Sequence, residues 1–266
     1  MNSNHHFSFH EIESSSNKYF KLLKSLNSSK GIKTEKLFFL CGKKLIQDYL
    51  NTTSWQKQFP LFSEITFTDY KNKTPNFYTD QFSNFSQKIF RYVLNLKLFQ
   101  ELDELGTNEN LLVLKAPEVY FKNESLNPNN NLNVILPLSD PNNLGAAIRS
   151  CVGFGVHKIY LTTESANPFL QKSVRASAGS VLDTNFAWLD SVEKIPSENV
   201  VGFDSSGKDL TTYTWQKSST ILIGQEGKGL PAYVKNKISI PTEKIESLNA
   251  TVALSIALFH YKQQFP

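Results

Sequence analysis

The chain has 266 residues, 40% of them hydrophobic, which suits one large domain or two small ones with packed cores. Its two cysteines, Cys41 and Cys151, form no C-x-x-C pair, which argues against a zinc site or a disulfide framework and favours a reducing, cytoplasmic setting. The net charge is only +4, yet residues 18–97 hold 14 Lys and Arg residues against five Asp and Glu residues. This asymmetry is as typical of a surface for a polyanion as of a solvated lysine-rich face.

Residues 1–17 are polar and lack Lys and Arg, so we expect a flexible N-terminal tail and not a signal peptide. No stretch approaches the ~18 apolar residues that a membrane helix needs, so we expect no membrane association. The tail contains His5, His6 and His10, which could bind a metal. A disordered tail explains them better, and we expect no metal site.

Residues 18–122 are predicted to form a small α/β domain. Apolar runs predict strands at residues 37–40, 64–68 and 111–114. Helical spacing of apolar residues predicts helices at residues 16–25, 42–50 and, in two pieces, 80–105. The Asn-rich residues 123–131, interrupted by Pro128, are predicted to be a linker.

Strands and helices alternate over the second predicted domain, residues 132–266. The predicted strands occupy residues 132–136, 158–162, 200–204, 220–224 and 237–240. The predicted helices occupy residues 143–154, 169–177 and 247–261. This alternation is typical of a mainly parallel sheet with helices on both faces. From the pattern alone we expect an unknotted doubly wound sheet, because threaded chains are very rare.

Three motifs follow predicted strands of this domain. They are Asp-Pro-Asn-Asn-Leu-Gly-Ala-Ala-Ile-Arg at residues 140–149, Gly-Gln-Glu-Gly-Lys-Gly-Leu at residues 224–230, and Ile-Pro at residues 240–241 with Glu-Ser-Leu-Asn at residues 246–249. Loops at the carboxyl ends of parallel strands are where an open α/β sheet binds its ligand. Taken singly, the motifs also have simpler explanations: Asn143 can cap a helix, the glycines can form a turn, and one of Ser247 and Asn249 can cap the last helix.

Arg149 is not explained by capping or turn formation. It lies among small residues of a predicted helix, where a guanidinium needs a partner, and a phosphate or carboxylate matches its fork.

Two common nucleotide-binding patterns do not fit. Gly153-Phe154-Gly155 begins like a dinucleotide fingerprint, but residue 158 is Lys and the segment ends a predicted helix where the fingerprint would begin one. Gly224 and Gly229 have the spacing of a P-loop, but Leu and Pro follow in place of Gly-Lys-Ser/Thr. The sequence therefore gives little support for NAD or ATP.

In this order and spacing, the three motifs resemble those of the SpoU/TrmH-type RNA 2′-O-ribose methyltransferases of the SPOUT superfamily. The family pattern is roughly Asp-Pro-x-Asn-x-Gly-x-x-x-Arg, Gly-x-Glu-x-x-Gly and Ile-Pro-x-x-x-x-x-Ser-Leu-Asn, and every fixed position is present. Residues 175–179 also look like a segment that these enzymes carry between the first two motifs. The likeness covers residues 130–262 closely and residues 18–116 loosely. Gln225 departs from the family, which more often has Asn or a small residue there.

The resemblance implies a fold, a cofactor and a reaction. The fold would be a SPOUT α/β domain with a deep trefoil knot, preceded by a small α/β substrate-binding domain, in a homodimer. The reaction would move a methyl group from S-adenosyl-L-methionine to a ribose 2′-hydroxyl of RNA. The implied catalytic residues are Arg149, Asn143, Glu226, Ser247 and Asn249. The implied cofactor-binding residues are Gly224, Ile240, Leu248 and Thr162. An arginine is nearly always protonated, so whether Arg149 is the base or a phosphate ligand stays open.

The substrate is less defined than the reaction. Ribosomal RNA is the first expectation, because family members with such an added domain commonly act there, and transfer RNA is the second. A non-catalytic RNA-binding protein with the same fold and a base-nitrogen methyltransferase are the alternatives. The presence of Arg149, Glu226, Ser247 and Asn249 disfavours the non-catalytic reading.

Overall fold

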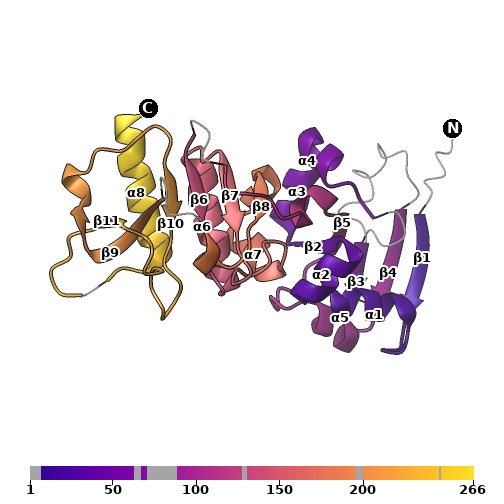
Figure 1. Ribbon diagram of the computed structural model, residues 1–266. Coiled ribbons are helices and arrows are strands. Elements are labelled where there is room, and N and C mark those ends of the chain that lie inside the picture. The colour runs from indigo at the N-terminus through magenta and orange to yellow at the C-terminus, as the bar shows by residue number, and fades with distance from the viewer. Residues whose placement is uncertain (1–6, 63–66, 71–88, 128–130, 196–199, 246) are drawn as a thin grey trace. The chain divides into compact units, whose positions relative to one another are not determined.

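A computed structural model describes the chain except for residues 1–6, 63–66, 71–88, 128–130, 196–199 and 246. The fold consists of two compact units (Figure 1). Unit 1 comprises residues 1–117 together with residues 169–174, and unit 2 comprises residues 118–168 and 175–266. Among the described residues, no helix is long and apolar enough to cross a membrane.

Unit 1 contains a five-stranded sheet in the order β1-β4-β3-β5-β2. The strands are β1 (Phe7–Ile12), β2 (Leu37–Cys41), β3 (Phe67–Tyr70), β4 (Ile89–Leu94) and β5 (Leu111–Lys115). The helices are α1 (Lys18–Ser25), α2 (Ser29–Glu35), α3 (Lys43–Asn51), α4 (Thr53–Gln58) and α5 (Leu96–Leu102). The strands β1, β4 and β3 run parallel, whereas β5 is antiparallel to both of its neighbours.

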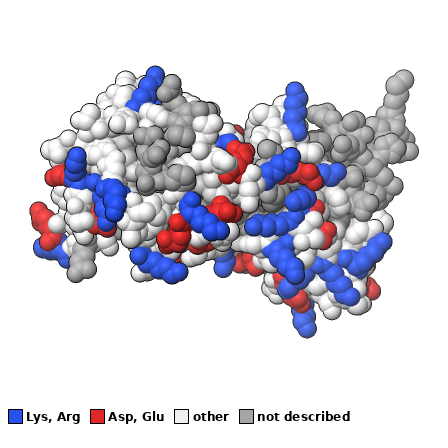
Figure 2. Space-filling model, viewed as in Figure 1, with Lys and Arg blue, Asp and Glu red and all other residues white. Residues whose placement is uncertain are grey.

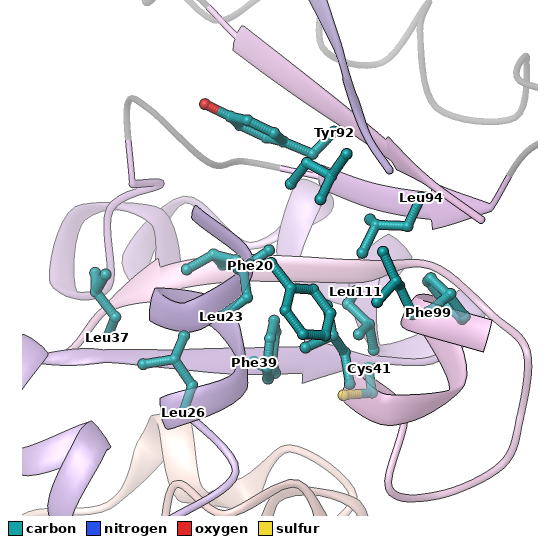
Figure 3. Packing of buried hydrophobic residues seen from close by; sticks show 14 residues of the cluster. Phe20, Leu23, Leu26, Leu37, Phe39, Cys41, Tyr92, Leu94, Phe99 and Leu111 are labelled. Atoms are coloured by element: carbon teal, nitrogen blue, oxygen red, sulfur yellow. The ribbon is translucent and has the colours of Figure 1, made fainter. Parts of the chain in front are cut away.

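The core of unit 1 lies between this sheet and the helices α1 and α5 (Figure 3). Phe20 and Leu23 of α1 pack there with Phe39 of β2 and Phe99 of α5, all 3% exposed or less. The helices at 18–25 and 43–51 and the strands at 37–41 and 111–115 confirm the predictions for those segments.

The predicted helix at residues 80–105 is wrong in its middle part. Residues 89–94 form β4, and a helix begins only at Leu96; residues 80–88 lie outside the described part. The segment is rich in aromatic and β-branched residues, which favour strands, and Tyr92 and Leu94 are buried in the core. Asn95 then starts α5, because its side chain accepts a hydrogen bond from Leu98 N–H at 2.9 Å.

Part of the predicted tail is also ordered. Residues 7–12 form β1, which pairs with β4 along its whole length. Backbone pairing, burial of Ile12 and stacking of the His10 ring on Tyr92 at 5.3 Å hold this edge strand in place. The predicted strand at residues 64–68 lies only partly within the described residues, where β3 begins at Phe67.

Residues 169–174 belong to unit 1, although they lie within the second half of the sequence. Phe169 is 1% exposed and its ring centroid lies 4.6 Å from that of Phe38. The Gln171 side chain donates hydrogen bonds to the Leu102 carbonyl at 2.6 Å and to Asn27 Oδ1 at 2.8 Å, and it accepts one from Cys41 Sγ. Unit 1 is therefore discontinuous in sequence.

Unit 2 contains a six-stranded, fully parallel sheet in the order β11-β9-β10-β6-β7-β8, which confirms the predicted parallel α/β architecture. The strands are β6 (Asn133–Ile135), β7 (Lys158–Leu161), β8 (Phe186–Trp188), β9 (Val200–Asp209), β10 (Thr220–Leu222) and β11 (Asn236–Ser239). The helices are α6 (Pro141–Gly153), α7 (Gln171–Ala176), which begins in unit 1, and α8 (Ala250–Gln264). Short 3-10 turns lie at Glu118–Phe121, Ser180–Asp183, Val192–Lys194 and Leu210–Thr212.

The helices α6 and α8 pack against each other through small residues. The hydroxyls of Ser150 and Ser255 lie 2.7 Å apart, and Thr251 Oγ1 donates a hydrogen bond to the Asn143 carbonyl at 3.2 Å. This close contact brings the start of α8 next to the start of α6. It thereby places the third sequence motif beside the first.

The described part of the predicted linker belongs to unit 2. Asn123 pairs with Trp188 as a parallel bridge, and Glu124 N–H donates to the Trp188 carbonyl at 2.8 Å. Lys158 also forms an ion pair with Glu124. These bonds extend the sheet edge at β8, so residues 123 and 124 are anchored there; residues 128–130 lie outside the described part.

Candidate functional site

A cleft of about 830 Å³ opens in unit 2 beside the carboxyl ends of β10 and β11 and the middle of β9. These three strands are neighbours in the sheet, so the loops after β10 and β11 lie close to the middle of β9. The lining residues are Phe203, Asp204, Ser205, Ile223, Gly224, Gln225, Glu226, Gly227, Gly229, Ile238, Ser239, Ile240, Pro241, Thr242, Ile245, Ser247, Leu248, Asn249, Ala250 and Ala253. The second and third motifs of the sequence thus form much of its wall.

The loop after β10 is closed by its own backbone. Gln225 N–H donates to the Gly229 carbonyl and Gly229 N–H donates to the Gln225 carbonyl, both at 2.9 Å. Gly227 and Gly229 have φ angles of +80° and +72°, which only glycine adopts without strain. A Cβ on Gly224 would lie 3.0 Å from the Gly229 carbonyl carbon, so this glycine permits the close approach. The sequence of the loop therefore determines its shape.

The first motif reaches the cleft through Asn143. The cap of α6 is Asp140, whose carboxylate accepts hydrogen bonds from the Asn142 and Asn143 N–H groups at 2.9 and 2.8 Å, so the expectation that Asn143 can serve as the cap is wrong. The Asn143 side chain instead donates from Nδ2 to Glu226 Oε1 at 2.6 Å. The structure therefore brings together a polar residue of the first motif and the carboxylate of the second.

The third motif leads into α8. Asn249 is the cap of this helix, since its side chain accepts a hydrogen bond from Thr251 N–H at 2.9 Å. Ser247 and Leu248 line the cleft beside it, as does Ile240 from the end of β11. Residue 246 lies outside the described part of the chain.

Three of the predicted site residues do not line the cleft: Arg149, Thr162 and Asn143, the last of which contacts it through Glu226. Arg149 is exposed on α6 and has no hydrogen-bond or ion-pair partner among the residues that the structure describes. Thr162 is fully buried at the end of β7, where its N–H donates to Ser165 Oγ at 2.8 Å. The cleft gathers the other predicted residues: Gly224, Glu226, Ile240, Ser247, Leu248 and Asn249 directly, and Asn143 through Glu226.

The sequence did not lead us to predict that residues of β9 line the cleft. Lys237 of β11 pairs with Gly202 of β9, but the next residue, Ile238, pairs with Lys208, so residues 203–207 bulge out of the sheet. A Cβ on Gly207 would lie 2.5 Å from the Ile238 carbonyl carbon, so only glycine fits there. The predicted strand ended at residue 204. The Asp-Ser-Ser-Gly sequence at residues 204–207 was the available signal for a turn.

Hydrogen bonds hold Asp204 of this bulge ionised. Its carboxylate accepts from the Ser206 hydroxyl at 2.5 Å and from Ser206 N–H at 2.9 Å, and Lys237 Nζ lies 3.0 Å away. The hydrogen bonds from Ser206, together with that from Lys237, lower the pKa of Asp204 to about 2. The bulge is thus tied to β11 by an ion pair at the edge of the cleft.

In the described part of the cleft wall, the charged groups are all of one sign. Asp204 and Glu226 are the charged residues among the described lining, and the remaining residues of that lining are apolar, hydroxyl, amide or glycine. Such a site suits a ligand with an apolar part, groups that bond to backbone, and a positive charge. No group of three or more His, Cys, Asp or Glu residues that could hold a metal is found in the described part of the chain.

The chain is similar to known proteins in sequence and in fold. The chain is 30% identical to "Ribosomal RNA small subunit methyltransferase G 2" of Syntrophobacter fumaroxidans, over 96% of this chain and 49% of that relative. The chain thus spans about half the length of this curated relative. A crystal structure of an AdoMet-bound rRNA methyltransferase from Sinorhizobium meliloti matches with a TM-score of 0.73 and 21% identity, over 97% of this chain and 99% of that chain.

A third match is a crystal structure of an RNA 2′-O ribose methyltransferase, with a TM-score of 0.72 and 17% identity, over 96% of this chain and 99% of that chain. At these identities the two structures establish the likeness of fold. Residues 131–259, which contain all three motifs and the cleft, match the profile of the SpoU rRNA Methylase family. This part of the chain is thus similar to the SpoU family of RNA methyltransferases.

Proposed function

We propose that this protein is an S-adenosylmethionine-dependent RNA methyltransferase that acts on a ribose 2′-hydroxyl. The observation that carries the proposal is the cleft of unit 2, where the second and third family motifs meet and Asn143 of the first motif contacts Glu226. When bound, S-adenosylmethionine supplies a methyl group already activated by its positively charged sulfur. No metal is required for such a transfer.

The residues of the cleft fit this cofactor. Ile223, Ile240 and Leu248 provide apolar surface for an adenine ring, and Gly224 exposes backbone groups at the end of β10. Glu226 offers negative charge to a cationic ligand, and Asp204 does so to a lesser extent because Lys237 pairs with it. Thr162 is fully buried away from the cleft lining, so this proposal gives it no cofactor contact.

Arg149 acts on the RNA in this proposal. Its guanidinium is exposed and has no partner among the described residues, so it is free to bind a phosphate of the incoming strand. A phosphate held there orients the nucleotide and helps the hydroxyl lose its proton as the methyl group arrives. Asn143, Glu226, Ser247 and Asn249 position the reactants around the cleft.

The RNA partner is supported by the charge on unit 1. Between Lys18 and Lys36 the chain carries six lysines and one acidic residue, Glu35. The lysines of α1 and α2 are on the surface, and Figure 2 shows Lys and Arg side chains gathered on unit 1. Ribosomal RNA is the proposed substrate and transfer RNA the second candidate. The name of the Syntrophobacter relative does not decide between them, because half of that protein lies outside the match.

We also propose a homodimer and a trefoil knot. Val252, Ile256 and Phe259 form an exposed apolar stripe along α8, 37% to 54% exposed, which a second copy of the chain would cover. The knot is supported by the strand order, in which the early strand β6 lies beside the late strand β10. A crystal structure whose final segment passes through no loop would refute the knot.

Both cysteines are free and buried, which supports a cytoplasmic location that cell fractionation tests.

The test of the reaction has two stages. Isothermal titration with S-adenosylmethionine should show binding; a protein that takes up no cofactor would be an RNA-binding protein only. Purified protein should then be incubated with ribosomal and transfer RNA and labelled cofactor, followed by digestion to nucleosides and mass spectrometry. A methyl group on ribose supports the proposal, whereas a methyl group on a base would contradict it.

A further inference from the structure

The two carboxylates of the cleft differ in how their charge is balanced. Lys237 Nζ lies 3.0 Å from Asp204 Oδ2, so the charge of Asp204 is largely neutralised by a neighbour that is not part of the cleft lining. Among the described residues, the hydrogen-bond partners of Glu226 are neutral: Asn143 Nδ2 at 2.6 Å and the Ser139 hydroxyl at 3.5 Å. The lining residues that the structure describes include no lysine or arginine. Within this described lining, Glu226 therefore carries the one negative charge that has no counter-charge.

We infer that Glu226 makes the cleft selective for the sulfonium cofactor over its thioether product, and so limits product inhibition. The inference rests on the proposed function, because it assigns S-adenosylmethionine to this cleft. Methyl transfer forms a C–O bond and breaks a C–S bond; the sulfur keeps the electron pair and loses its positive charge, and the hydroxyl proton leaves to solvent. S-adenosylhomocysteine thus has almost the same shape as the cofactor but one positive charge fewer.

Comparing these two ligands isolates the electrostatic contribution of Glu226 to binding. Contacts to the adenine, the ribose and the amino-acid part are common to both ligands and cancel in the ratio of their dissociation constants. The ratio therefore depends on the two features in which the ligands differ, the charge on the sulfur and the transferred methyl group. Glu226 is exposed, so solvent screens its charge, and its effect on the ratio should be modest, about two- to fivefold.

The experiment measures dissociation constants of both ligands by calorimetry on the full chain and three variants. In Glu226→Gln, the ratio of the S-adenosylhomocysteine constant to the S-adenosylmethionine constant should fall about two- to fivefold. In Lys237→Gln, the ratio should rise, because Asp204 loses its counter-charge. Glu243→Gln, on the neighbouring loop between β11 and α8 and outside the lining, should leave the ratio unchanged. Raising the salt concentration should shrink both shifts.

The outcomes separate this inference from the proposed function. A wild-type chain that binds neither ligand refutes the cofactor assignment and the inference with it. A chain that binds both, with ratios unaltered in Glu226→Gln and Lys237→Gln, keeps the proposed function and overturns the inference. Equal shifts in Glu243→Gln and Glu226→Gln would also overturn it, because net charge alone would then be responsible. If Glu226→Gln shows no thermal unfolding transition and is therefore not folded, Lys237→Gln alone tests the inference. A higher ratio in that variant supports the inference, and an unchanged ratio overturns it.

Discussion

Arg149 lies on the exposed side of α6, with Asn142 about two turns earlier on the same side. Because its guanidinium has no partner among the described residues, removing it should not affect packing. We expect Arg149→Ala to reduce methyl transfer by about 100-fold or more while the melting temperature and the cofactor dissociation constant stay unchanged. Arg149→Lys should recover only part of the activity, since an ammonium cannot form the two-point contact. Turnover near the wild-type rate in Arg149→Ala would refute the assignment.

Glu164 is a structural carboxylate beside Thr162. Burial opposes its ionisation, but hydrogen bonds from the Ser191 and Thr162 hydroxyls and from Val192 N–H outweigh this and lower the pKa of Glu164 from 4.5 to about 2. A carboxylate with a lowered pKa stabilises the fold above its unfolded pKa and loses this effect as the pH falls toward the folded pKa.

The wild type should therefore be more stable than Glu164→Gln by about 1 kcal/mol near neutral pH, after allowing for solvent screening. The difference should disappear as the pH falls from 4.5 to about 2. Urea unfolding at several pH values measures this difference in the free energy of unfolding. The control is Glu193→Gln, a variant of an exposed glutamate nearby. A difference that does not depend on pH would show that the hydrogen bonds do not favour the ionised form.

At the scale of elements, the segment 169–174 completes the core of unit 1. Phe169 packs between Phe38 and Phe59, with ring centroids at 4.6 and 6.0 Å. We expect Phe169→Ala to destabilise unit 1 by about 3–5 kcal/mol. Hydrogen exchange should then be faster in β2 and α3 than in α6 and α8. Faster exchange in α6 and α8 with β2 unaffected would contradict the assignment of this segment to unit 1.

The helices α1 and α2 carry the lysines proposed to contact RNA. Lys21 and Lys30 are exposed, one on each helix. Replacing both with alanine should weaken binding to different RNA sequences alike and lower the slope of log affinity against log salt by roughly one per lost contact. Lys235→Ala in unit 2 provides a matched control. An unchanged salt slope in the double variant would remove α1 and α2 from the RNA interface.

At the scale of the whole molecule, α8 is apolar on opposite sides. Leu254 and Leu258 are buried in unit 2, whereas Val252, Ile256 and Phe259 are exposed on the other side. We expect Ile256→Lys to convert a dimer into a monomer, as measured by light scattering, without unfolding unit 2. Leu254→Lys should unfold the protein and serves as the contrasting variant. A wild-type chain that is monomeric at all concentrations would refute the dimer.

Much of unit 2 was predictable because its strands are short apolar runs and its motifs are local. The turn at residues 224–229 follows from glycines, and the cap at Asn249 follows from the residue before a helix. Unit 1 was harder. Residues 89–94 combine apolar spacing that fits a helix with aromatic and β-branched residues that favour a strand, and only pairing with β1 and β3 makes the strand the stable choice.

By itself, the sequence determined the parallel α/β class, the order of the three motifs and the resemblance to a family, because these depend on local patterns and on identities at fixed spacing. Tertiary structure alone decided that Asp140 caps α6. The Asn143 side chain is therefore available to donate a hydrogen bond to Glu226, which lies 83 residues further along the chain. Tertiary structure also decided that residues 203–207 lose their pairing with β11, that residues 203–205 of this bulge line the cleft, and that residues 169–174 belong to unit 1. Each of these depends on which distant segment a residue packs against, and no local pattern specifies that choice.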